Sequence, residues 1–312
     1  MKITLLCNRD LPSHVALGHL VKGLAEHSLS IFISEKVGAD KVLPEPLMEL
    51  AAFERQLLMD GRPSFEQLAE RAGCSLQGFV DLDNKVNTPE GIARIAATEP
   101  ELIISVRFGL IIREAVIALP NQGIINLHSG LLPNYRGVMA TFRAMQNNDT
   151  EIASTLHYIR DCGIDNGDII SISAIPLNPQ QSYLLNVINL YAGGCQQIIS
   201  AVSNLCAGKG LVAYPQEQVS TYYSFPSQAE LDAGGSLVNH VTASSAEAPD
   251  ATDELSIPIT RTPAMTVTKG AAETTVDAAG DCAAAGMITS QSITAVRRWS
   301  SVNVRGQTSP GL

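Results

Sequence analysis

The sequence has no run of about 18 apolar residues, so we expect no membrane-spanning helix. Residues 1–10 meet charged side chains after only a few apolar positions, which is too short for a signal peptide and typical of a first buried strand. The six cysteines form no Cys-x-x-Cys pair, so neither a zinc site nor a disulfide framework is expected, and buried reduced thiols fit a cytoplasmic protein. A chain of 312 residues that is 45% hydrophobic can build one large or two modest domains.

Basic residues are also scarce, with 21 Lys and Arg against 31 Asp and Glu and a formal net charge of −10. An acidic surface repels polyphosphates at long range, which argues against general nucleic-acid binding and leaves open only a local basic patch. Phosphate-binding signatures are missing as well, because Asn8, Arg9 and Asp10 follow the first predicted strand where a dinucleotide-binding protein would have Gly-x-Gly-x-x-Gly. No phosphate-binding loop, His-Glu-x-x-His or Gly-x-Ser-x-Gly occurs either, and no metal is expected.

The apolar pattern predicts alternating strands and helices. Residues 2–7 and 29–34 are expected to be buried strands, joined by a helix that Ser13 caps, which makes a parallel βαβ unit. Thr88, followed by Pro89 and an acidic residue, is a strong helix start. The remaining expected elements are helices within 45–72, 111–119, 138–147 and 181–207 and strands at 102–106, 123–127, 152–159 and 168–174. We therefore predict an open, doubly wound, Rossmann-like α/β sheet.

The composition changes towards the end of the chain. After about residue 240 the sequence is rich in Ala, Ser and Thr, and Trp299 is its only aromatic residue. Neither a helical nor a strand period persists there, so the apolar clusters are too thin to offset chain entropy. We expect a catalytic domain over residues 1–230 and a disordered tail over 231–312. A non-native extension, for example from a shifted reading frame, is the alternative.

Two polar clusters follow predicted strands. Asn126 and His128 stand two residues apart at the end of one strand, so both side chains are expected on one face, where an amide and an imidazole can polarise a carbonyl and move a proton. The second cluster holds Asp161, Asp165 and Asp168 in a glycine-containing turn. It fits a solvated loop, or a calcium loop that lacks the EF-hand spacing, or a carboxylate source for a histidine at the sheet edge. The other histidines, His157 among them, are expected to be solvated or packed.

Taken together, these segments resemble the formyltransferase family that uses 10-formyltetrahydrofolate. Its members carry Asn-x-His, a Leu-Leu-Pro loop, Tyr-Arg-Gly and an Asp-x-Gly-x-Asp-x-Gly turn. The matching positions here are Asn126 and His128, Gly130 to Pro133, Tyr135-Arg136-Gly137, and Asp161 to Gly167. The resemblance is specific over about 100–175 and extends over 1–230, with Gly130 in place of a serine that members often carry.

The resemblance implies a site. Asn126, His128 and Asp165 occupy the positions of the family's catalytic triad, and the formyl donor 10-formyltetrahydrofolate would be the only cofactor, without a metal. The residues that match the family's folate-binding positions are Arg107, Phe108, Gly109, Leu110, Ile111, Gly130, Leu131, Leu132, Pro133 and Asp161.

The expected activity is formyl transfer to the primary amine of a small molecule, such as an amino sugar or a nucleotide-linked sugar. Methionyl-tRNA formylation and hydrolysis of the formyl donor are the enzymatic alternatives, and a folate-binding pseudoenzyme is the alternative without catalysis. Neither a nucleic acid nor a membrane is an expected partner, and a homodimer stays open.

Overall fold

The computed structural model is divided into two compact units, which are described separately. The first unit takes in Met1–Pro44, Glu54–Asn178 and Tyr183–Ser227, and the second takes in Glu45–Phe53, Pro179–Ser182 and Gln228–Leu312. The structure describes residues 1–34, 43–59, 61–79, 85–217, 221–233, 236–245, 248–258 and 266–269.

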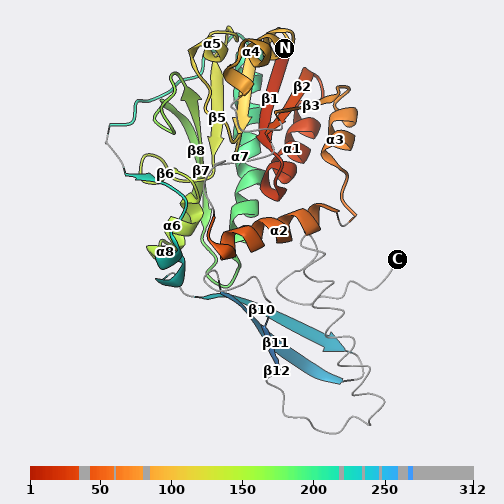
Figure 1. The fold of residues 1–312 in the computed structure, drawn as a ribbon, viewed down its shortest axis with the longest axis vertical. Coiled ribbons are helices and arrows are strands. Elements are labelled where there is room, and N and C mark those ends of the chain that lie inside the picture. Colours follow the sequence, from red (N-terminus) through yellow and green to blue (C-terminus); the bar gives the residue numbers. More distant parts are fainter. Residues whose placement is uncertain are drawn as a thin grey trace. The chain divides into compact units, whose positions relative to one another are not determined.

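A seven-stranded sheet forms the first unit, in the order β3-β2-β1-β4-β5-β7-β8 (Figure 1). The strands β1 to β5 pair in parallel, whereas β7 pairs antiparallel with both β5 and β8. The predicted α/β fold class is confirmed, with an antiparallel portion at one side. The bounds are β1 Lys2–Asn8, β2 Ser28–Ser34, β3 Leu76–Phe79, β4 Leu102–Val106, β5 Ile124–His128, β7 Glu151–Ile159 and β8 Ile169–Pro176.

The helices largely follow the predicted order. Their bounds are α1 Leu11–Gly23, α2 Glu45–Met59, α3 Phe65–Arg71, α4 Pro89–Ala96, α5 Glu114–Ile117, α6 Ala140–Gln146, α7 Tyr183–Cys206 and α8 Gln228–Ala233, with a short 3-10 helix at Lys85–Asn87. Thr88 caps α4 through the Gly91 N–H, as predicted. The cap of α1 is Asp10 instead of Ser13, because the Asp10 carboxylate accepts from the Ser13 N–H and the helix already begins at Leu11.

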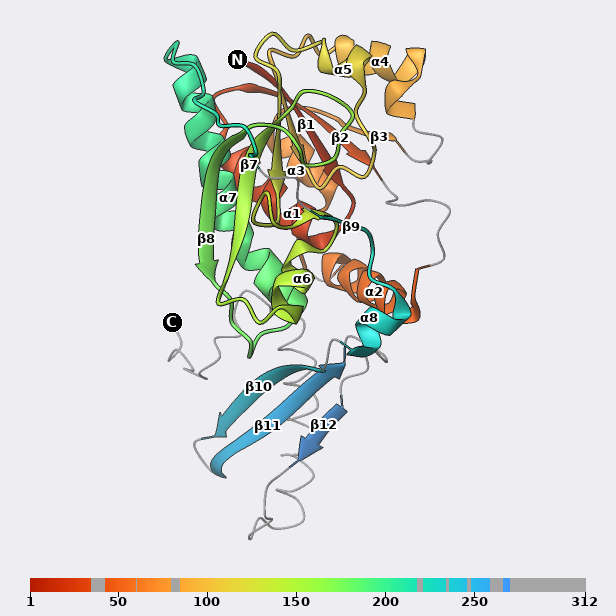
Figure 2. The same ribbon diagram turned by 90° about the vertical axis from the view of Figure 1, so that its left-hand side faces the viewer.

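Helices cover both faces of the sheet. The helix α7 packs against β7, β8 and α1, and Figure 2 shows α4 and α5 on the other side of the sheet from α7. Gly193 and Gly194 in the middle of α7 allow this close packing. A Cβ on Gly194 would lie 2.9 Å from Leu127, and one on Gly193 would lie 2.4 Å from the Ser173 hydroxyl.

The strand order predicts a ligand-binding crevice, called the crevice position below, at the carboxyl ends of β1 and β4. From β1 the chain goes on to β2 and β3 at one side, and from β4 it goes on to β5 at the other. Ligands of open α/β sheets bind where the strand order reverses in this way. Asp10 follows β1 and Arg107 follows β4, so both stand at this position.

Two smaller sheets complete the described residues. Within the first unit, β6 (Arg136–Gly137) pairs in parallel with β9 (Tyr222–Tyr223). Within the second unit, β10 (Ser236–Ser245), β11 (Ala248–Pro258) and β12 (Thr266–Lys269) form an antiparallel sheet in the segment that we expected to be disordered. Residues 270–312 lie outside the described residues, so the division near residue 230 and the tail beyond 269 stay predictions.

Candidate active site

Asn126 and His128 lie at the carboxyl end of β5, as the two-residue spacing predicts. The His128 side chain is buried and Asn126 is half-buried. The His128 Nε2 lies 2.7 Å from the Tyr135 carbonyl oxygen. A carbonyl only accepts hydrogen bonds, so Nε2 carries a proton and Nδ1 is the ring atom that faces the rest of the site.

The Asp165 carboxylate meets His128 from the turn between β7 and β8. Its Oδ2 lies 3.4 Å from His128 Nδ1 and accepts a 2.9 Å hydrogen bond from the Gly137 N–H. Asp165 has a φ of 50°, in the left-handed region that residues other than glycine rarely adopt. The structure therefore brings together the three predicted triad residues, Asn126, His128 and Asp165, and it does so with strained backbone at the carboxylate.

His157 is a fourth polar residue of this cluster, and it was not singled out from the sequence. It lies on β7 directly opposite Asn126, and its Nε2 is 3.0 Å from Asn126 Nδ2 and 3.4 Å from Asp165 Oδ1. Its Nδ1 donates to the Tyr158 carbonyl, so in the neutral ring Nε2 accepts from the Asn126 amide. The only signal for His157 is the antiparallel β5–β7 register, which a sequence does not display.

Opposing effects set the protonation of the central pair. Burial alone would raise the pKa of Asp165, but the positive charge that His128 can carry, the neighbouring His157 and the hydrogen bond from the Gly137 N–H outweigh it and lower the pKa to about 2. Burial lowers the pKa of His128, and the Asp165 carboxylate works against that shift. The result is a carboxylate that stays ionised beside an imidazole whose pKa lies below its ordinary value.

Residues 107–111, expected at the folate, follow β4. The Phe108 ring lies 6.2 Å from the Phe79 ring, and Leu110 packs against the same apolar cluster. The Gly109 N–H donates to Ser34 Oγ, and the Ile111 carbonyl accepts from Asn87 Nδ2. The chain itself thus already uses two backbone groups of this segment, while the Ile111 side chain remains 46% exposed.

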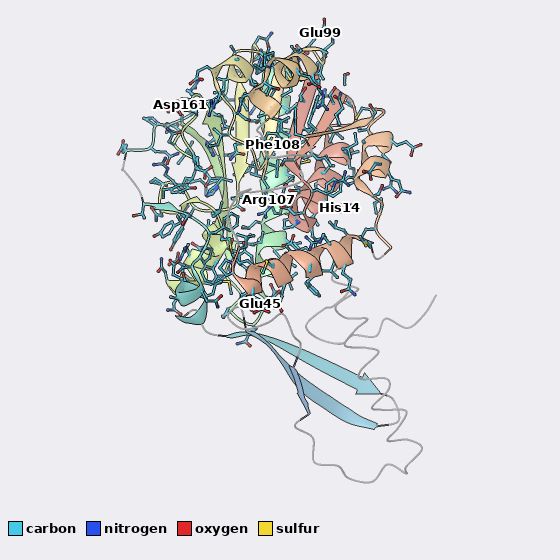
Figure 3. The ribbon with its side chains drawn as sticks, in the orientation of Figure 1. His14, Glu45, Glu99, Arg107, Phe108 and Asp161 are labelled. Carbon is cyan, nitrogen blue, oxygen red and sulfur yellow. The ribbon has the colours of Figure 1, made fainter. Side chains whose placement is uncertain are left out.

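Arg107 forms an ion pair of its own at the crevice position. Its Nε lies 3.0 Å from Asp10 Oδ2, and its φ is 56°. Figure 3 labels Arg107 and the neighbouring Phe108 in the domain. Burial and the neighbouring Asp10 charge raise the pKa of Glu54 to about 7, although Arg107 works against this shift. Glu54 Oε2 accepts from the Leu11 N–H. The Arg107 side chain therefore forms an ion pair with Asp10, and its charge also acts on the Glu54 carboxylate.

The loop at 130–133 passes close to His128. The Gly130 carbonyl accepts from Thr155 Oγ1, and the Leu132 N–H donates to the same hydroxyl. A Cβ on Gly130 would lie 2.4 Å from Ala140 Cβ and 2.6 Å from His128 Nε2. A side chain at this position would therefore collide with its neighbours, which favours glycine here. Leu131 packs against the cluster of Tyr135 and Ala140, and Pro133 is half-buried.

Asp161 and Asp168 lie away from the His128 pair. The exposed Asp161 accepts from the Gly163 N–H and from Asn166 Nδ2, so it closes its own turn (Figure 3). Asp168 pairs with Arg160 at 3.1 Å on the surface. Asp165 is therefore the carboxylate of this turn that reaches the histidine, whereas a folate contact of Asp161 stays a prediction.

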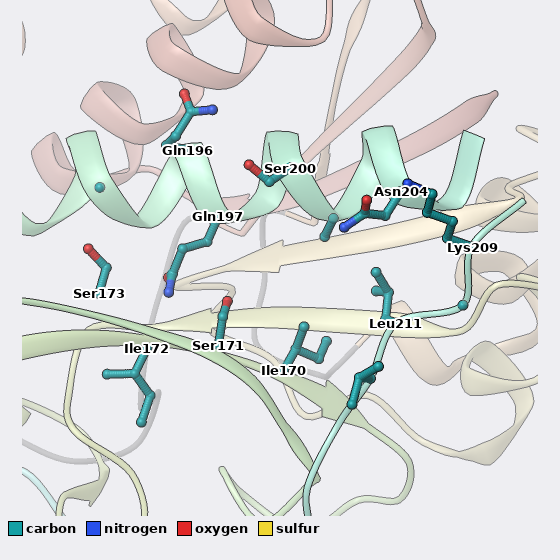
Figure 4. A pocket seen from close by; sticks show the side chains of 14 residues that line it. Ile170, Ser171, Ile172, Ser173, Gln196, Gln197, Ser200, Asn204, Lys209 and Leu211 are labelled. Carbon is teal, nitrogen blue, oxygen red and sulfur yellow. The ribbon is translucent and has the colours of Figure 1, made fainter. Parts of the chain in front are cut away.

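A separate cavity of about 820 Å³ lies between β8 and α7 (Figure 4). Serines of β8 and the polar side chains of Gln196, Gln197 and Asn204 line it, and none of the predicted site residues does. Within the described ranges, no group of three or more His, Cys, Asp and Glu side chains is arranged to hold a metal ion. Those ranges also contain no helix with the length and apolar character that a membrane span requires.

The fold and the site define an α/β domain that presents an amide, an imidazole and a carboxylate at the carboxyl end of a central strand. The formyl transferase family model matches residues 59–184, so this part of the chain resembles that family. The predicted resemblance is thereby confirmed.

Comparisons with known proteins agree on this family. The chain is 31% identical over 147 residues to the methionyl-tRNA formyltransferase of Hydrogenovibrio crunogenus, covering 47% of each chain. It is 35% identical over 140 residues to that of Geobacter sulfurreducens, covering 45% of this chain and 44% of the relative. The chain thus spans about half the length of these curated relatives.

Two solved structures are similar to this chain at low sequence identity. A sugar N-formyltransferase from a Shewanella species has a TM-score of 0.47 and 17% identity, with 71% of this chain and 76% of that chain covered. Glycinamide ribonucleotide transformylase 1 from Symbiobacterium toebii has a TM-score of 0.49 and 16% identity, with 69% and 93% covered.

Proposed function

We propose that this chain transfers a formyl group from 10-formyltetrahydrofolate to a primary amine. The observation that carries the proposal is the contact between His128 and Asp165 beside Asn126, inside a domain that resembles the formyl transferase family. The three side chains supply a hydrogen-bond donor, a proton carrier and a fixed negative charge, which are the groups that acyl transfer to nitrogen requires.

The acceptor amine attacks the formyl carbon, and negative charge develops on the formyl oxygen. Asn126 Nδ2 has two hydrogens, and its 3.5 Å contact to Asp165 is at the limit of a hydrogen bond. The amide hydrogen that faces Asp165 is the one that can turn to the formyl oxygen. The second amide hydrogen stays in the bond to His157 Nε2.

Protonated His128 stabilises the same charge and delivers a proton to the folate nitrogen as the carbon–nitrogen bond to the donor breaks. The ionised Asp165 holds the imidazolium and accepts, through water, the proton that the amine loses. One proton enters at the leaving nitrogen and one leaves the attacking nitrogen, so the step balances without a covalent enzyme intermediate.

The donor would bind across the carboxyl ends of β4 and β5. Residues 107–111 and 130–133 flank that edge of the sheet, and Asp161 stands in the turn that supplies Asp165. Phe108 and Leu110 fit this role because they anchor the first segment in the core, which leaves the adjacent Ile111 exposed at the crevice.

For the acceptor, we propose a small-molecule amine, such as an amino sugar or a nucleotide-linked sugar. The support is the formal charge of −10, since binding to a nucleic acid draws on basic side chains that neutralise phosphates. Initiator tRNA is the second candidate, and what favours it is that the relatives at 31–35% identity are methionyl-tRNA formyltransferases.

The deciding experiment is a screen of amine acceptors with 10-formyltetrahydrofolate, followed by release of tetrahydrofolate. Formylation of an amino sugar or nucleotide sugar, with no formylation of charged initiator tRNA, is the expected result. Efficient tRNA formylation that weakens steeply with salt would replace the small-molecule proposal. Donor breakdown without an acceptor would mean a hydrolase, and donor binding without any turnover would mean a folate-binding pseudoenzyme.

A further inference from the structure

The loop at residues 135–139 touches both members of the His128–Asp165 pair. The Tyr135 carbonyl accepts from His128 Nε2 at 2.7 Å, and the Gly137 N–H donates to Asp165 Oδ2 at 2.9 Å. Between them, the Arg136 guanidinium donates to the Ile164 carbonyl at 3.0 and 2.7 Å. This loop therefore sets the distance between the imidazole and the carboxylate.

The strand β9 holds the same loop from its other side. Arg136 pairs with Tyr222 and Gly137 pairs with Tyr223, and the Val138 N–H donates to the Tyr223 carbonyl at 2.9 Å. Gly137 has a φ of 97°, and a Cβ there would lie 2.1 Å from the Tyr223 carbonyl oxygen. The two backbones approach so closely that only glycine fits at this position.

One side chain anchors β9 to the domain. The Tyr223 ring lies 6.0 Å from the Tyr135 ring, and the Arg143 guanidinium lies 5.1 Å above it. Tyr223 also packs against the buried cluster that contains Tyr135 and Ala140. The neighbouring Tyr222 is 48% exposed, so Tyr223 is the residue of the pair that fastens the strand.

We propose that β9 positions the catalytic pair, with Tyr223 as a positioning residue that acts through Gly137 and Tyr135. The proposal rests on the proposed function for its kinetic consequence and on the contacts alone for its structural consequence. Without the anchor, β6 shifts, and the Gly137 N–H no longer holds Asp165 against His128. Weaker contact with the carboxylate lowers the proton affinity of the imidazole.

The test compares Tyr223→Ala with Tyr223→Phe, Gly137→Ala and the double variant Gly137→Ala/Tyr223→Ala. Tyr214→Ala is the control, because Tyr214 is an exposed tyrosine outside the loop. We expect Tyr223→Ala to lower kcat at least tenfold, with the dissociation constant for 10-formyltetrahydrofolate within about twofold of the parent. Tyr223→Phe keeps the ring and should restore kcat. The double variant should be no slower than Gly137→Ala alone, because both changes act on one contact.

A second readout needs no turnover. In an NMR titration, the pKa of His128 should fall by at least about half a unit in Tyr223→Ala and stay unchanged in Tyr214→Ala. If the parent transfers no formyl group, the proposed function fails and this titration alone decides the role of β9. A parent-like titration and kcat, equal losses of kcat and donor affinity, or multiplicative losses in the double variant would overturn the proposal. Should Tyr223→Ala not fold, Tyr223→Leu is measured by the same criteria.

Discussion

Two carboxylates of the domain, Asp165 and Asp10, each face a basic side chain at the strand ends, and the partner decides what each can do. Asp165 lies 3.4 Å from His128, whereas Asp10 lies 3.0 Å from Arg107. An imidazole exchanges protons near neutral pH, but a guanidinium stays charged. The first pair can therefore move a proton, and the second is a fixed pair of charges that holds β1 and β4 together at their ends.

The comparison predicts its largest effect at Asp165. Asp165→Asn keeps the shape but removes the charge that favours the His128 imidazolium, so kcat should fall by about 10² to 10⁴, or roughly 3–5 kcal/mol of barrier. The dissociation constant of the folate donor should change little. Asp168→Asn is the matched control, because Asp168 pairs with Arg160 at the surface, and it should cost less than about tenfold. Full turnover in Asp165→Asn together with a dead Asp168→Asn would show that the turn was assigned wrongly.

The second prediction concerns Arg107, where the quantity measured is the free energy of unfolding instead of kcat. Arg107→Met takes the cation away from Asp10 and Glu54, and a carboxylate left without its buried partner is costly. The Arg107 and Asp10 side chains are 27% and 14% exposed, so we expect a loss of about 3 kcal/mol in the free energy of unfolding, at the low end for buried pairs. Arg9→Met breaks the more exposed pair with Glu66 and should cost about 1 kcal/mol or less. Equal losses in chemical denaturation would contradict the structural role of Arg107.

Glu54 gives the Asp10 cluster a pH dependence. Its pKa is raised to about 7 from 4.5, so its contribution to stability is full below about pH 4.5 and is lost as the pH rises through 7. Glu54→Gln removes this loss, and the free energy of unfolding at pH 8 should exceed that of the parent by about 3 kcal/mol. The difference should vanish near pH 4. Glu66→Gln serves as the control, because the pKa of Glu66 is lowered and its removal should not stabilise the protein. A Glu54→Gln variant less stable than the parent at pH 8 would refute the assignment.

The smallest effect is expected at Gly130, on the His128 side of the comparison. Gly130→Ser introduces a Cβ that collides with Ala140 and with the His128 ring, so the imidazole must shift. We expect kcat to fall about tenfold, or roughly 1.4 kcal/mol. Ala140→Gly in the same chain should restore part of the loss by opening one of the two contacts. Unchanged kcat in Gly130→Ser would mean that the loop moves freely around His128.

Most of the candidate site could be predicted from short motifs. The two-residue spacing of Asn126 and His128 on one strand predicts that both side chains share a face, and their proposed roles come from the resemblance to the family. Asp165 followed from the family turn, and its contact with His128 is visible only in the structure. His157 could not be foreseen, since its role depends on standing opposite Asn126 across an antiparallel pair. Pairing between strands far apart in the sequence leaves no local pattern.

Prediction of the fold was limited in the same way, because local sequence patterns do not show which strands pair. The predicted strands and helices follow apolar periodicity and caps such as Thr88, which are local signals. The strand β3 was missed because it is short and contains Gly78, which weakens a strand pattern, and only its pairing with β2 defines it. Asp10 was passed over as the cap of α1 because Ser13 is also a good capping residue, and the choice depends on where the helix begins.

Three residues in the left-handed backbone region surround the site, namely Arg107, Met139 and Asp165. Each such residue costs of order 1–3 kcal/mol and persists only where its surroundings hold it. Holding these three backbone conformations lowers the free energy of unfolding of a domain whose stability is small to begin with. This limits how many further destabilising substitutions its sequence can accept. Laboratory selection for heat resistance alone should favour glycine at these positions. At Asp165 the more stable variant would lack the carboxylate that contacts His128.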